Sequence, residues 1–109
     1  MKALVVCALA TLSASLVQAA TSYAVAQPIL NKNGCLACHA LDKKVVGPSY
    51  VDVAAKYKGK ADAPAYLAQK IKAGGVGVWG QVPMPPNPGI SEADTKTVVD
   101  WLLSGAPAK

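Results

Sequence analysis

Residues 31–44 read NKNGCLACHALDKK, and the run CLACH inside them places Cys35, Cys38 and His39 within one short span. His39 is the only histidine of the chain. The pattern C-x-x-C-H is the attachment signature of c-type haem. One helical turn brings both thiols to the vinyl groups of a single porphyrin, and His39 then lies under the ring centre, where its imidazole can ligate the iron. The motif therefore predicts one covalently bound haem c.

Two other kinds of site use the same residue types. A thioredoxin-like dithiol would need a βαβ pattern around the cysteines, and the sequence shows none. A closed structural zinc site needs a fourth ligand, and after residue 20 the chain holds no further cysteine or histidine. We therefore prefer the haem interpretation.

A second axial ligand follows from the methionine count. Met1 and Met84 are the only methionines, and Met1 belongs to an N-terminal segment that we expect to be removed. A lone methionine normally fills a gap in a core. Met84, however, stands in the run VPMPPN, where prolines on both sides restrict the backbone and can hold the sulfur in place. We expect His39 and Met84 to be the two axial ligands of the iron.

The first twenty residues, MKALVVCALATLSASLVQAA, have the layout of a secretory signal peptide. Lys2 precedes an uncharged apolar run that ends at the small-residue pattern Val17-Gln18-Ala19. A membrane anchor is the alternative, but the run is shorter than the roughly 20 residues that span a bilayer. We expect a signal over residues 1–19, cleaved after Ala19 or Ala20, and one domain over residues 20–109. The mature chain would then lie in the periplasm without stable membrane insertion.

The charge balance of the mature chain narrows the class of partner. Ten lysines and no arginine face six acidic residues, a net charge of +4. A moderate positive charge suits docking on acidic proteins. The lysines are spread out without interleaved aromatic residues, so we expect no nucleic-acid binding.

The positions of glycine, proline and capping residues, together with the hydrophobic spacing, predict four helices and no strand. The predicted fold class is therefore small all-α. The first runs from Tyr23, or from Pro28, to Asn33 before Gly34, and the second lies within residues 49–59. Asp62 is the candidate N-cap of the third, which ends at Gly74, and Ser91 is that of the last. Residues 75–89, rich in glycine and proline, fit no regular element, and a loop this long in a small domain is usually functional.

Four runs, GCLACH, VGPSY, AQKIKAGGVGVWG and PMPPN, together resemble the class I c-type cytochromes of the small bacterial cytochrome c-551 (c8) type. The resemblance covers essentially all of residues 20–109, with one apparent extra residue in NPGIS. It implies about four helices wrapped around one haem, with the terminal helices crossing. It also implies a single-electron carrier between redox proteins, not an enzyme: a cytochrome bc complex as donor, and a nitrite reductase or terminal oxidase as acceptor. We expect a monomer.

The same resemblance implies roles around the haem. The carbonyl of Pro48 would accept the Nδ1 proton of His39, the indole of Trp79 would reach a propionate, and Asn87 would bond to the methionine sulfur. Each also has a plainer interpretation, as a helix-start proline, a core residue or a turn residue. Leu30 and Tyr57 would pack on the haem or simply belong to the core. Lys70 stands where many relatives have arginine, and without a bidentate fork it would hold a propionate less rigidly.

Two further function classes use haem or thiols differently. A haem enzyme or gas sensor would need an open sixth position, and a dithiol oxidoreductase would leave the thiols free. For the preferred carrier, we expect an apolar contact patch at Leu36, Ala37, Val45, Pro85 and Pro86. Lys43 and Lys44 beside it either steer acidic partners or are simply solvated.

Overall fold

A computed structural model describes residues 21–109. Its elements are α1 (Tyr23–Lys32), the short 3-10 turn η1 (Cys35–Ala37), α2 (Tyr50–Tyr57), α3 (Ala63–Ala73) and α4 (Glu92–Leu103). The described part of the chain contains these four α-helices and no strand, so the all-α prediction is confirmed. The expected signal segment and its cleavage site lie outside the described residues.

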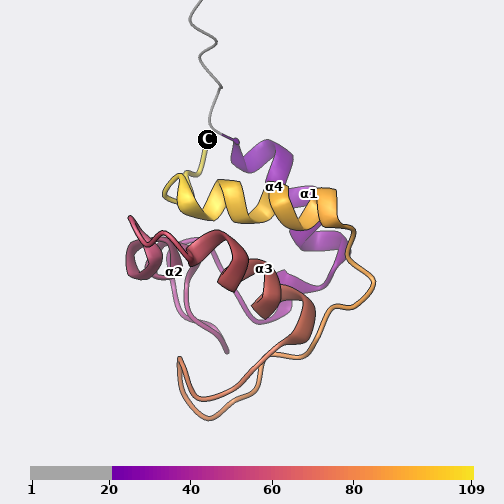
Figure 1. Ribbon diagram of the computed structural model, residues 1–109, viewed down its shortest axis with the longest axis vertical. Coiled ribbons are helices and arrows are strands. Elements are labelled where there is room, and N and C mark those ends of the chain that lie inside the picture. The colour runs from indigo at the N-terminus through magenta and orange to yellow at the C-terminus, as the bar shows by residue number, and fades with distance from the viewer. Residues whose placement is uncertain (1–20) are drawn as a thin grey trace, which may run out of the picture.

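Helix α4 organises the core. It contacts α1, α2 and α3, and Figure 1 shows it lying across α1 with α2 and α3 on its other side. Trp101, near the C-terminal end of this helix, is fully buried; its ring centroid lies 5.5 Å from that of Tyr23 and 5.2 Å from that of Tyr50. Its indole nitrogen donates to the carbonyl oxygen of Pro107 at 3.0 Å. The terminal helices are thus joined through one aromatic cluster, which buries much apolar area.

The helix boundaries follow the residues that predicted them. The hydroxyls of Ser49 and Ser91 each accept a hydrogen bond, at 3.0 Å, from the amide three residues later, and so cap α2 and α4. Gly34 ends α1 with a left-handed φ of 71°, a conformation that glycine adopts without steric cost. It turns the chain directly into the CLACH segment.

The prediction that Asp62 caps α3 is only half right. Asp62 occupies the N-cap position, but its side chain makes no capping hydrogen bond. Its backbone is already in the helical region, with φ −87° and ψ −7°. An N-cap residue normally has extended backbone, which directs its side chain at the first free amides. Pro64 in the first turn and Gly74 at the end mark the helix as expected.

Residues 75–89 form the long irregular connection between α3 and α4. In Figure 1 this orange segment leaves α3, sweeps away from the helices and returns to α4. It contains no helix, and Gly75 and Met84 form an isolated β-bridge within it. None of the helices within residues 21–109 has the length and apolar character needed to cross a membrane.

Candidate functional site

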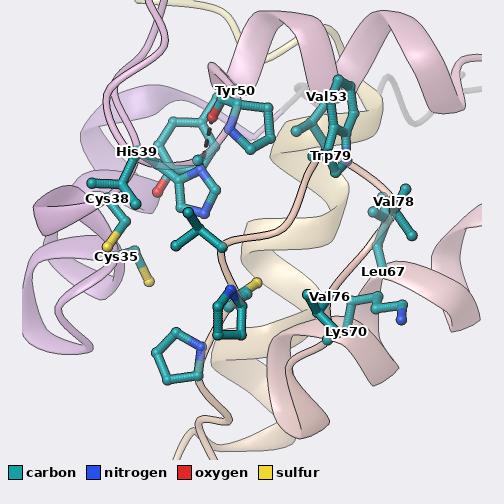
Figure 2. Close-up of a pocket in the computed structure, with 18 of the residues that line it drawn as sticks. Cys35, Cys38, His39, Tyr50, Val53, Leu67, Lys70, Val76, Val78 and Trp79 are labelled. Atoms are coloured by element: carbon teal, nitrogen blue, oxygen red, sulfur yellow. Dashed lines mark hydrogen bonds between the residues drawn. The ribbon is translucent and has the colours of Figure 1, made fainter.

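A cavity lies between the CLACH segment and the loop 75–89. Its volume of about 280 Å³ is many times the roughly 10–15 Å³ that one water molecule requires. Figure 2 shows Cys35, Cys38 and His39 on one side of it, and Leu67, Lys70 and Val76 on the other. The lining is mostly apolar and includes every residue that the sequence assigned to a haem: Leu30, Cys35, Cys38, His39, Pro48, Tyr57, Lys70, Trp79, Met84 and Asn87.

The imidazole of His39 is held in one orientation. Its Nδ1 lies 2.7 Å from the carbonyl oxygen of Pro48. A carbonyl oxygen only accepts, so Nδ1 carries the proton and donates it. The other ring nitrogen, Nε2, is then unprotonated and available as a metal ligand. This is the contact that the sequence suggested for Pro48.

Gly47 makes room for that imidazole. A Cβ at residue 47 would lie 2.6 Å from Cε1 of His39 and 3.0 Å from its Nδ1, closer than non-bonded carbon atoms approach. The backbone amide of Gly47 also donates to the carbonyl oxygen of Cys38 at 2.8 Å. The segment 47–48 therefore packs directly on the CLACH turn, and only glycine fits at its first position.

The two cysteines are free, half-buried thiols on the cavity wall. Burial raises the pKa of the Cys35 thiol above its usual value. A redox-active dithiol instead has a lowered thiol pKa, so the environment does not favour that alternative. Within residues 21–109, no three His, Cys, Asp or Glu side chains gather as they would around a metal ion. The zinc alternative therefore finds no support there either.

Met84 is placed on the cavity by the backbone of its loop. Its amide donates to the carbonyl oxygen of Gly75 at 2.8 Å, and the amide of Gly75 donates back at 3.1 Å. Gly74 permits this close approach, because a Cβ there would lie 2.3 Å from the carbonyl oxygen of Met84. The Met84 side chain is half-buried and lines the cavity. The C-terminal end of α3 thus fixes the position of the lone thioether.

Asn87 lines the cavity but bonds to backbone in this structure. Its amide nitrogen donates to the carbonyl oxygen of Ile71 at 3.1 Å and to that of Pro85 at 3.4 Å. Its backbone amide donates to the carbonyl oxygen of Lys72 at 3.1 Å. These bonds tie the loop to α3, and a bond from Asn87 to the sulfur of Met84 stays a prediction.

The remaining residues of the expected haem environment differ in exposure. Leu30 and Tyr57 are buried, with 1% and 7% of their surface exposed, while Trp79 is 40% exposed. Burial beside Tyr66 raises the pKa of Tyr57 to about 12. The charged side chains that line the cavity are Lys44 and Lys70, and no acidic side chain does so.

Tyr50 is a cavity residue that the sequence did not single out. It is 95% buried, its ring lies 5.2 Å from that of His39, and its hydroxyl has no hydrogen-bond partner within the described residues. Burial and the neighbouring Cys35 raise its pKa well above the usual range. Val53, Tyr66, Val98 and Leu102 also line the cavity. Hydrophobic spacing predicts which residues share a face of a helix but not which side chains face a cofactor.

Comparison with known proteins agrees with this geometry. The profile of the cytochrome c family matches residues 24–106. The chain is 57% identical over 76 residues to cytochrome c-552 of Nitrosomonas europaea, covering 70% of this chain and 74% of that protein. It is 57% identical over 77 residues to cytochrome c-551 of Pseudomonas aeruginosa, covering 70% and 73%.

The chain belongs to the cytochrome c family. The crystal structure of wild-type Nitrosomonas europaea cytochrome c552 superposes with a TM-score of 0.69 at 54% identity, covering 72% of this chain and 98% of that one. The resemblance to small class I c-type cytochromes and the all-α cytochrome c fold are thereby confirmed. As a member of this family, the protein carries one covalently bound haem c and takes part in electron transport.

Proposed function

We propose that this cytochrome is a periplasmic single-electron carrier whose haem iron is ligated by His39 and Met84. The observation that supports this most strongly is the shared cavity. Its lining includes two thiols and the only histidine and only methionine of the described chain. A flat ring tethered at Cys35 and Cys38 would have an imidazole available on one face and a thioether on the other.

The two cysteines attach the group. Each thiol would add across one vinyl double bond, with the sulfur bonding to one carbon and its hydrogen going to the other, so that no oxidant would be needed. Because Cys35 and Cys38 lie in and beside the single turn η1, both bonds anchor the same edge of the ring.

His39 and Met84 set the electronic character of the iron. Bound haem supplies reversible one-electron exchange at that iron. The proton of His39 is held at Nδ1 by Pro48, so that Nε2 would be available to bind the iron. A soft thioether favours the ferrous state more than a second imidazole would, and apolar walls disfavour the extra charge of the ferric state. If His39 and Met84 both bound the iron, no position would remain for dioxygen or a substrate.

Electron exchange would occur across the edge near the cysteines. Ala37, Val45, Pro85 and Pro86 are exposed and Leu36 is half-exposed, which fits the apolar contact patch expected there. Lys43 and Lys44 are exposed and can steer an acidic partner. The proposed donor is a cytochrome bc complex, and the proposed acceptor is a nitrite reductase or terminal oxidase. The proposed location requires residues 1–19 to act as the export signal.

Expression of the full chain in a host that matures c-type cytochromes tests the proposal. Intact mass should show the processed chain plus one haem, and titration should find no free thiol. The oxidised protein should show the weak near-infrared to red absorption band of methionine–iron bonding. A colourless protein at bare polypeptide mass would refute the haem assignment, and a coloured one lacking that band would refute Met84 as ligand.

A further inference from the structure

Three lysine ammonium groups lie over aromatic rings that line the haem cavity. Lys56 Nζ is 4.6 Å from the centroid of the Trp79 ring and 5.9 Å from that of Tyr57. Lys60 Nζ is 5.5 Å from the Tyr57 centroid, and Lys70 Nζ is 5.5 Å from that of Tyr66. All these distances are within the range of cation–π attraction. Positive charge from α2, from the turn after it and from α3 therefore lies beside the aromatic lining of the cavity, and of these three lysines Lys70 itself lines it.

This edge has no acidic counterpart. Across residues 21–109 the one salt bridge joins Lys96 to Asp100, on α4. No aspartate or glutamate lines the cavity. Like charges near one another favour a bound anion and lower the pKa of a carboxylic acid placed among them.

The two carboxylates of a haem attached at the cysteines are the anions that this edge would receive. The vinyl groups of a haem and its two carboxylates lie on opposite edges of the ring. Cys35 and Cys38 fix the vinyl edge, and Figure 2 shows Lys70 and Trp79 on the side of the cavity away from these cysteines. The carboxylate edge of a ring attached at these cysteines would therefore be directed toward the lysines and their aromatic rings.

Lys56 differs from the other two because its ring partner lies on the loop. Trp79 is 40% exposed and is followed by Gly80, which has a φ of 126°. The loop around it closes through one bond of 2.9 Å, from the amide of Gly77 to the carbonyl oxygen of Gly80. Trp79 itself lies outside the helices, so the contact from Lys56, together with the neighbouring Tyr57, connects the indole to the rigid helix α2.

We propose that Lys56 is a positioning residue, which holds the Trp79 indole at the cavity edge and adds positive charge beside the haem carboxylates. This rests on the proposed function of the cavity and deepens it. The other titratable groups at this edge are Lys60, Lys70, Tyr57 and Tyr66, which lie on the turn after α2, on α3 and on α2. The charge of Lys56 is the one that also orders the loop.

The experiment compares three variants of the haem-loaded protein. Lys56→Gln removes the charge, Lys56→Arg keeps it, and Lys58→Gln removes an exposed charge from the same turn that lies over no described aromatic ring. The midpoint potential is measured against pH, and the exchange rate of the Trp79 indole N–H is measured by NMR.

Lys56→Gln should raise the pH at which the potential titrates by about half a unit, a threefold change in proton affinity. It should also speed exchange of the Trp79 indole N–H severalfold. Lys56→Arg should restore both values, and Lys58→Gln should leave both unchanged. Equal effects of Lys56→Gln and Lys58→Gln, or no effect of either, would overturn the proposal. Absence of covalent haem in the unsubstituted protein would instead refute the proposed function, so the two failures are distinguishable.

Discussion

The Nδ1 atom of His39 lies 2.7 Å from the carbonyl oxygen of Pro48, and Gly47 directly before that proline packs against the same imidazole. One short backbone segment therefore fixes both the tautomer and the position of the ring. Pro48 contributes its backbone carbonyl, and Gly47 has no side chain, so both contacts on this side of the imidazole come from the backbone. The orientation of this imidazole is therefore set by the backbone between the CLACH turn and α2.

Gly47→Ala should displace His39 and destabilise the protein. The new Cβ would meet Cε1 at 2.6 Å, and overpacking of this kind costs about 1–3 kcal/mol. Guanidinium unfolding of the haem-loaded protein measures the loss, and the visible spectrum reports altered ligation. Gly89→Ala is the matched control, because no atom lies within 4 Å of a Cβ there. Equal stability of the two variants would contradict the packing of Gly47 on His39.

Met84→Ala should open the sixth position of the iron while leaving the haem attached. The thioether bonds depend on Cys35 and Cys38, so the mass should still include one haem. The ferrous protein should bind carbon monoxide, and the potential should fall by a substantial part of the about 0.8 V that axial ligands span. Val51→Ala, at an α2 position that is 41% exposed and does not line the cavity, should change neither property. Carbon monoxide binding by the unsubstituted protein would instead favour a haem enzyme or sensor.

Tyr50→Phe should leave stability unchanged or raise it by about 1 kcal/mol. The Tyr50 hydroxyl is buried without a hydrogen-bond partner in the described chain, and an unsatisfied buried hydroxyl costs about 1–3 kcal/mol. Phenylalanine keeps the ring contacts with His39 and Trp101. Denaturant unfolding provides the measurement. A clear loss of stability would show that the hydroxyl has a partner in the haem-loaded protein, such as a buried water molecule.

Stability should fall between about pH 10 and pH 12 in a way that depends on Tyr57. The pKa of Tyr57 is raised to about 12 from its usual value of 10.0, because burial disfavours the phenolate. The folded state therefore holds its proton more tightly than the unfolded state. The resulting stabilisation is complete below pH 10 and is lost as the pH rises to 12. Tyr57→Phe should flatten the unfolding free energy over that interval, and an identical slope in both proteins would contradict it.

The helices could be predicted from the sequence because the residues at their ends act on backbone groups close to them in the chain. Gly34, Ser49 and Ser91 each satisfy or release backbone groups within a few residues, and such local effects can be inferred from spacing alone. Asp62 stands at a helix start but does not cap it, since its φ and ψ are set by the preceding turn. Local preference identifies the position and not the hydrogen bond.

The sequence indicated which residues line the cavity better than it indicated their contacts with one another. Cysteine and histidine spacing, together with a count of methionines, selected four residues that do share one cavity. The neighbours of the loop 75–89 were not predictable, because its glycine and proline residues follow no period. Two sets of contacts depend on where that loop returns to the helices. They are the hydrogen bonds from Asn87 to Ile71 and Pro85, and the position of Lys56 over the Trp79 ring.

Removing Lys43 and Lys44 together should slow electron transfer to an anionic oxidant at low salt. Both side chains are exposed, and Lys44 lines the haem cavity. Stopped-flow oxidation by hexacyanoferrate(III) should slow roughly threefold in the Lys43→Gln/Lys44→Gln variant, and the difference should shrink with salt as the Debye length falls from about 10 Å at 0.1 M to about 3 Å at 1 M. Lys96→Gln serves as control, since Lys96 pairs with Asp100 at 2.6 Å on α4 and does not line the cavity. If all three proteins respond to salt alike, Lys43 and Lys44 belong to a solvated surface and do not steer partners.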